Sequence, residues 1–121
     1  MIIIHATTRI APESREAFLA AARATIADSL KEDGCVTYSL SEDITEPGAF
    51  NWIEVWRDLD AFNDHVNAEH HLELLRQLAG PIQRSGPAHG TTFEARVVDT
   101  EEQRRMGFAE ASAVGYVPAG A

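Results

Sequence analysis

The segment Phe50–Trp56 (FNWIEVW) constrains the fold of this 121-residue chain more than any other, because it is apolar on both sides. In an extended strand, successive side chains point to opposite faces of the sheet. Phe50, Trp52 and Trp56 therefore share one face, whereas Ile53 and Val55 lie on the other. A strand of this kind is usually covered on both faces. We expect helices of the same chain on one face and a second copy of the chain on the other.

The rest of the chain alternates between strand-like and helix-like segments. Pro12 is well placed early in a helix, Gly34 supplies a left-handed stop at its end, and Asp58 is a plausible N-cap for the next helix. Val36, Tyr38 and Leu40 are expected on one face of the second strand. The expected order is a strand over residues 2–9, a helix over 13–31, strands over 35–40 and 50–56, two short helices over about 58–79, and a strand over 91–98.

This order, β-α-β-β-α(α)-β, is typical of the ferredoxin-like split βαβ arrangement. The fold class is therefore α+β, with a four-stranded antiparallel sheet and helices on one face. Within one chain the second sheet face stays bare, and an apolar face of this size favours an isologous dimer. The fold hosts many unrelated activities, so it leaves the function open.

Composition excludes several classes of protein. Lys plus Arg total 10 and Asp plus Glu total 19, a net charge of −9, so nucleic acid and anionic membranes are not expected partners. The single cysteine, Cys35, allows no intrachain disulfide. No stretch approaches the ~20 apolar residues of a membrane span, and the start MIIIHATTRI lacks the basic region of a signal peptide. A cytoplasmic location is the expectation.

The segment over residues 34–71 carries an ordered set of motifs that resembles the antibiotic biosynthesis monooxygenase domain family. It begins with a Gly-Cys-x-x-Tyr strand start and continues with a Glu-x-Trp strand end. An aspartate-capped helix with a phenylalanine and a His-x4-His spacing follow. The residues concerned are Gly34, Cys35, Tyr38, Glu54, Trp56, Phe62, His65 and His70. The resemblance spans residues 1–98, which we expect to form the domain.

The resemblance implies a dimeric α+β barrel, with a pocket between the sheet and helices of each protomer. Some members of the family oxidise polycyclic aromatic phenols to quinones with O2 and without metal or flavin. Others act on quinols, cleave haem, or isomerise or cyclise oxygenated substrates. The haem-cleaving branch has Asn, Trp and His at positions where this chain has Thr8, His65 and Leu75, so haem cleavage is not expected.

His65 is the leading candidate for a catalytic base. A phenol or enol must become an anion before it passes an electron to oxygen, and histidine titrates near neutrality. His70 follows five residues later, a spacing that would separate the two rings on one continuous helix. A helix break near Asn67–Ala68 would bring both rings to the opening of one pocket, where His70 would bind substrate or share a proton. His71 is expected to point elsewhere.

Aromatic side chains are the candidates for substrate binding. Trp52 and Trp56 share a strand face, and they either form core or present a wall on which a flat ring stacks. Tyr38 could orient a substrate oxygen, and Phe62 would line the pocket. Glu54 lies between the two indoles, where a carboxylate is costly unless it is paired or solvated. We expect it to meet Arg9 or another basic group, or else to face a wet pocket.

Other chemistries have weaker support. The histidines show no chelating HxxxH or HxH spacing, so no metal is expected. No dinucleotide or phosphate-binding motif occurs, so no cofactor is expected. The leading hypothesis is a cofactor-independent monooxygenase that acts with O2 on a phenolic, quinol-like or polyketide-type aromatic. The alternatives are a non-oxidative isomerase or cyclase and a non-catalytic small-molecule-binding dimer.

The last segment, residues 99–121, is expected to be a tail outside the domain. It opens with charged residues and closes on GYVPAGA. We expect Tyr116, Val117 and Pro118 to pack on the partner subunit.

Overall fold

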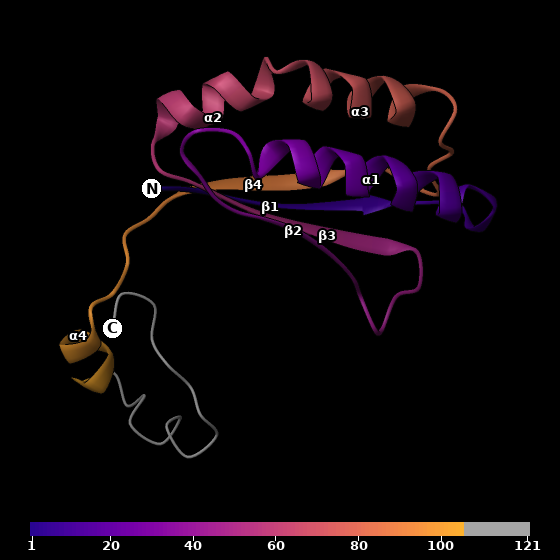
Figure 1. Ribbon diagram of the computed structural model, residues 1–121. Coiled ribbons are helices and arrows are strands. Elements are labelled where there is room, and N and C mark those ends of the chain that lie inside the picture. Colours follow the sequence, from indigo (N-terminus) through magenta and orange to yellow (C-terminus); the bar gives the residue numbers. More distant parts are fainter. Residues whose placement is uncertain (106–121) are drawn as a thin grey trace.

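The computed structural model describes residues 1–105, apart from the side chains of Thr100 and Arg104. Its body is a sheet layer with a helix layer on one side (Figure 1). In chain order the elements are β1 (Ile2–Arg9), the 3-10 turn η1 (Pro12–Ser14), α1 (Arg15–Ser29), β2 (Cys35–Glu42), β3 (Ala49–Trp56), α2 (Leu59–Val66), α3 (Glu69–Ala79), β4 (His89–Glu94) and α4 (Thr100–Arg105). The expected tail contacts of Tyr116, Val117 and Pro118 lie outside the described residues.

The sheet has four strands in the order β2-β3-β1-β4, and every neighbouring pair is antiparallel. β3 lies between β1 and β2, which are joined through α1, and this is the split βαβ unit that the element order predicts. The register pairs Ala6 with Trp52 and Ile4 with Glu54. The predicted fold class is confirmed.

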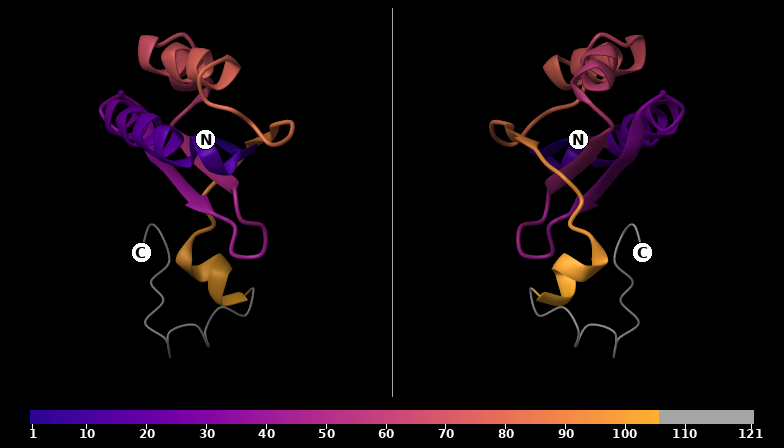
Figure 2. Two further views of the ribbon diagram at one scale, coloured as in Figure 1. Left: turned by 90° about the vertical axis from the view of Figure 1, so that its right-hand side faces the viewer. Right: turned by 90° about the vertical axis from the view of Figure 1, so that its left-hand side faces the viewer.

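Helices α1, α2 and α3 cover one face of the sheet (Figure 2). Under them lies an aromatic core. The ring of Phe18 from α1 lies 4.9 Å from the ring of Phe50 and 6.1 Å from that of Trp52, centroid to centroid. Tyr38 contacts Trp52 and Trp56 edge-on. The apolar side of β3 that carries the two tryptophans is therefore the helix-covered side.

The opposite sheet face is open and partly apolar. Ile3 pairs with Val55 and with Phe93, and Ile53 lies in the next row. Phe93 is 49% exposed. No helix in the described part of the chain is long and apolar enough to cross a membrane. A short helix, α4, extends away from the body of the domain (Figure 1).

Two local predictions were wrong for physical reasons. A β-bulge between Cys35 and Thr37 shifts the register, so Val36 is exposed while Tyr38 is buried. In α1 the apolar residues Phe18, Ala22, Ile26 and Leu30 recur every four positions, which predicts that they are buried together, but the buried side chains are Phe18, Ala22, Thr25 and Ser29, and Leu30 is exposed. A strict four-residue step drifts away from the 3.6-residue helical period, so the buried stripe moves to Thr25 and Ser29.

Candidate functional site

A glutamate joins the two histidines that the sequence singles out. Oε2 of Glu32 lies 2.7 Å from Nδ1 of His65 and 2.9 Å from Nε2 of His70. The rings of the two histidines are 5.8 Å apart, centroid to centroid. One carboxylate oxygen therefore accepts hydrogen bonds from both imidazoles, and the turn after α1 meets two consecutive helices, α2 and α3, at this point.

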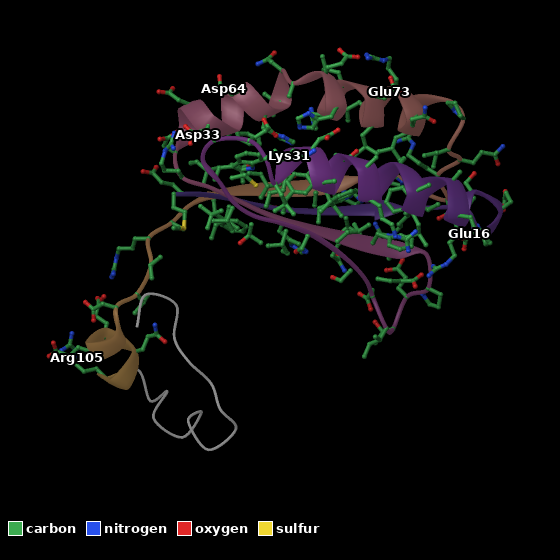
Figure 3. All side chains as sticks on the ribbon, in the orientation of Figure 1. Glu16, Lys31, Asp33, Asp64, Glu73 and Arg105 are labelled. Carbon is green, nitrogen blue, oxygen red and sulfur yellow. The ribbon has the colours of Figure 1, made fainter. Side chains whose placement is uncertain are left out.

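The local structure explains the convergence. α2 ends at Val66 and α3 begins at Glu69, with Ala68 in an extended conformation between them. This break redirects the chain and brings His70 to the same side as His65. Glu32 lies in the turn after α1, beneath α2, between Lys31 and Asp33, which are labelled in Figure 3. The closing turn includes Gly34 with a φ of +84°, which a glycine adopts without steric cost.

His65 is the buried member of the cluster. Its side chain is 1% exposed, and its ring stacks on Trp56 at 4.5 Å. Burial lowers the pKa of His65, and the neighbouring Glu32 carboxylate partly opposes that shift. His65 is therefore held neutral near pH 7, with Nδ1 donating to Glu32 and the lone pair on Nε2.

A second carboxylate lies behind His65. Oε1 of Glu54 accepts a hydrogen bond from Nε1 of Trp56 at 3.0 Å and lies 3.6 Å from Nε2 of His65. Among the residues that the structure describes, that nitrogen has no hydrogen-bond partner. Burial raises the pKa of Glu54, and the charge of Glu32 raises it further. Of the partners expected for Glu54, Arg9 pairs with Glu46 at 2.9 Å instead, and the basic group that Glu54 faces is the imidazole of His65.

The predicted aromatic residues lie behind the histidines. Tyr38, Trp52 and Trp56 are all buried core residues, and Phe62 is partly buried against the same core. The Tyr38 ring contacts the His65 ring edge-on at 5.3 Å. Burial and the charge of Glu54 raise the pKa of Tyr38, so its hydroxyl stays protonated. The core interpretation of the tryptophans fits their burial, and substrate contact stays a prediction for all four.

Sequence reasoning missed two members of this cluster. Glu32 is not part of any sequence motif. The one signal in the sequence is its position two residues before Gly34, in the turn after a helix. His71 was expected to point elsewhere, but its ring lies 4.7 Å from that of His65. Its Nδ1 lies 3.1 Å from the carbonyl oxygen of Val66, so the helix break holds it close.

Two cavities flank α3. A cavity of about 320 Å³ between α1 and α3 is lined by His70, and Thr25, Asp28, Leu74 and Gln77 are among its other wall residues. A smaller cavity, of about 210 Å³, lies against β1 and is lined by Thr8, Leu75, Leu78, Ala79, Arg84 and Ala88. His70 is thus the predicted site residue that connects the cluster to a cavity.

The fold and the histidine cluster define a small α+β domain with acid–base groups between its helices and its sheet. The model of the antibiotic biosynthesis monooxygenase family matches residues 1–77, more than half of the chain. The chain belongs to this family.

Two curated relatives match the same part of the chain. An uncharacterised protein of Synechocystis is 32% identical over 76 residues, which cover 63% of this chain and 52% of the relative. This chain therefore aligns with about half of that protein's length. A Bacillus subtilis protein named "Putative monooxygenase YcnE" is 34% identical over 70 residues, covering 58% of this chain and 74% of the relative.

Solved structures share the fold. A crystal structure of an antibiotic biosynthesis monooxygenase superposes with a TM-score of 0.72 at 26% identity, over 79% of this chain and 99% of that chain. A Deinococcus radiodurans protein, titled as a putative antibiotic biosynthesis monooxygenase, has a TM-score of 0.74 at 25% identity, over 83% and 97% of the two chains. These similarities establish the architecture, in agreement with the family that the family model identifies.

Proposed function

We propose that this protein is a cofactor-independent monooxygenase that oxidises a phenolic, quinol-like or polyketide-type aromatic small molecule with O2. The observation that carries the proposal is the array in which His65 and His70 share Oε2 of Glu32 while His70 lines a cavity. An imidazole at a cavity wall, held by a carboxylate, is the arrangement that a general base needs. The family membership supports the reaction class.

In this proposal His70 takes the proton from the substrate and Glu32 keeps the ring in place. The second imidazole, His65, stabilises the charge on Glu32 and shares the proton through the carboxylate. The resulting phenolate or enolate is electron-rich and passes electrons to O2. For a ring methylene next to a phenol, the balance is CH2 plus O2 giving C=O plus H2O, with the abstracted proton returned to the departing water.

The cavity between α1 and α3 is the proposed entry point for the substrate. Its volume of about 320 Å³ lies at the lower end of small-molecule pockets. Leu74 supplies an apolar wall, and Thr25 and Gln77 supply polar groups. Phe62 is the predicted aromatic residue with an exposed part, but it is not among the wall residues of this cavity, so its contact with a bound ring stays a prediction. The three buried aromatic residues would contribute indirectly, by holding the His65 ring in place. Tyr38 and Trp56 contact that ring, and Trp52 contacts Tyr38.

The working particle in this proposal is a cytoplasmic homodimer. Ile3, Ile53, Val55 and the half-exposed Phe93 form an apolar band on the open sheet face. A second copy of the same face would bury that band, which is the usual reason for an isologous interface. Residues 1–98 would form the dimerising domain, and residues 99–121 would pack on the partner.

Oxygen uptake by metal-free protein tests the reaction. With a hydroxyanthrone or a hydroquinone as substrate, wild type consumes oxygen, and His70→Ala lowers kcat/KM by about 10²- to 10⁴-fold, the usual worth of a general base. His65→Ala loses activity as well. The matched control is His89→Ala, because His89 is an exposed histidine on β4. Equal oxygen uptake by wild type, His65→Ala and His70→Ala refutes the mechanism.

Two further measurements locate and define the chemistry. Ala24→Trp fills the cavity beside His70, whereas Ala79→Trp fills the one beside Thr8, so the variant that raises KM identifies the substrate pocket. The same histidine pair can move protons without oxygen, which would make the protein a non-oxidative isomerase or cyclase. Turnover of the substrate under anaerobic conditions would establish that alternative in place of the oxidation.

A further inference from the structure

The three ligand-type atoms of the histidine cluster have the composition of a metal site. Oε2 of Glu32, Nδ1 of His65 and Nε2 of His70 all lie within 4.8 Å of one another. Two imidazoles and one carboxylate form the ligand set that binds Fe²⁺ in many oxygenases, and imidazole also suits Zn²⁺, Cu²⁺ and Ni²⁺. The ligands come from the turn after α1, from α2 and from α3, so the fold itself assembles the set.

The distances are hydrogen-bond distances, somewhat shorter than those between two ligands of one ion. Zinc binds histidine nitrogen at about 2.0–2.1 Å and carboxylate oxygen at about 2.0–2.2 Å in tetrahedral geometry, so two of its ligand atoms lie about 3.4 Å apart. The oxygen of Glu32 lies 2.7 and 2.9 Å from the two nitrogens. A cation that replaced the shared protons would therefore move this oxygen and the two nitrogens apart by about 0.5–0.7 Å.

A buried atom without a partner gives an independent indication. Within residues 1–105, Nε2 of His65 has no hydrogen-bond partner, although it lies 3.6 Å from Oε1 of Glu54. When Nδ1 of His65 carries the proton, Nε2 can only accept. When Nδ1 binds a metal, the proton moves to Nε2 and is donated toward Glu54. Histidines that bind metals are almost always oriented in this way, by a carboxylate or a carbonyl on the other ring nitrogen.

The charge balance favours a cation. Glu32 and Glu54 have side chains that are 16% and 11% exposed, and in the described part of the chain they form their ion-pair contacts with His65 and His70. The two carboxylates lie close together in a poorly hydrated place, where uncompensated negative charge is costly. A divalent ion would neutralise them, and His70 lies in the wall of the cavity that would admit it.

From these contacts we propose that Glu32, His65 and His70 form a binding site for a divalent first-row transition-metal ion, with Glu54 orienting His65. The site does not depend on the proposed oxidation. Ion and proton compete for the same nitrogen lone pairs, so the loaded protein is expected to lose base-driven turnover while the stripped protein keeps it.

Titration of the stripped, full-length protein with Co²⁺ tests the site. Wild type is expected to bind one ion per chain and to develop the visible absorption of nitrogen-ligated Co²⁺. His70→Ala and Glu32→Gln should each weaken binding by more than about 100-fold, beyond the 10- to 100-fold effect of losing an outer-shell partner. His5→Ala is the matched control, because His5 lies exposed on the open sheet face.

Two further readouts keep the test independent of activity and of variant folding. Zn²⁺ should raise the melting temperature of wild type with concentration, since it binds only the folded cluster. Bound Co²⁺ should shift the ring proton resonances of His65 and His70 in the wild-type protein. No saturable binding, equal binding by His5→Ala and the two cluster variants, or shifts confined to His5 and His89 would overturn the proposal, whatever the outcome of the oxygen assay.

Discussion

Gly34 offers a sharp test of how the turn after α1 is held against α2. Its φ is +84°, a region that costs a residue with a Cβ about 1–2 kcal/mol. A Cβ built on Gly34 would lie 2.6 Å from Cβ of Ala61, closer than two non-bonded carbon atoms approach in proteins. Relieving such overpacking typically costs about 1–3 kcal/mol. Gly34→Ala is therefore expected to lower the free energy of unfolding by about 2–5 kcal/mol, the sum of the two costs.

A double-mutant cycle separates the two costs. Ala61→Gly alone should destabilise by about 1 kcal/mol, the helix propensity difference. In the Gly34→Ala/Ala61→Gly variant the clash disappears and the backbone cost remains, so the coupling energy should be about 1–3 kcal/mol in the favourable direction. Gly48→Ala is the matched control, because its φ is +88° and its closest neighbour, at 3.0 Å, is the backbone oxygen of Ile10.

Urea denaturation followed by tryptophan fluorescence measures the free energy of unfolding of wild type, of the three variants in the cycle and of the Gly48→Ala control. At about 4 °C per kcal/mol for a domain of this size, Gly34→Ala should also lower the melting temperature by about 8–20 °C. Because Glu32 lies two residues before Gly34, the same variant should weaken the hold of Glu32 on His65. A loss below about 0.5 kcal/mol, or additive effects of Gly34→Ala and Ala61→Gly, would refute the steric reasoning.

Two further predictions concern polar groups outside the histidine cluster. Asp58 accepts a hydrogen bond from the backbone N–H of Ala61 at 2.8 Å, so Asp58→Ala should lower the free energy of unfolding by about 0.5–2 kcal/mol in urea titrations, whereas Asp58→Ser should retain most of it. Hydrogen bonds from Arg15 and from the backbone of Gly48 lower the pKa of Glu42. The stability that Glu42 contributes is therefore fully present above its pKa in the unfolded chain, near 4.5, and is lost as the pH falls through its lower pKa in the folded protein. Glu42→Gln should therefore flatten the stability–pH curve below pH 4.5, and an unchanged curve would contradict this reasoning.

The three polar residues of the cluster do not act independently of one another. Glu32, His65 and His70 form one hydrogen-bonded unit, so a substitution of one member changes the environment of the other two. His65 is 1% exposed, whereas the His70 side chain is 20% exposed. In the proposed mechanism His70 is therefore the residue that contacts the small molecule, and His65 would act through Glu32. Comparing His65→Ala with His70→Ala is informative only when both are measured for folding as well as turnover.

The sequence by itself determined the architecture, because the fold depends on local periodicity. Alternation in Phe50–Trp56 placed both tryptophans on one face of the strand, and Gly34 and Asp58 marked a helix stop and a helix start that the structure contains. These features depend on residues close in sequence, whose geometry is fixed by strand and helix periods. The ordered motifs over residues 34–71 also pointed to the family that the family model identifies.

Only the tertiary structure decided the composition of the cluster. Glu32 lies 33 residues from His65 and 38 from His70, and no local period relates these positions. The β-bulge at Cys35–Thr37, the break between α2 and α3, and the turn at Gly34 together set which atoms meet. Glu54 faced His65 rather than Arg9 for the same reason: the partner of a buried charge is chosen by packing between elements, which sequence spacing does not encode.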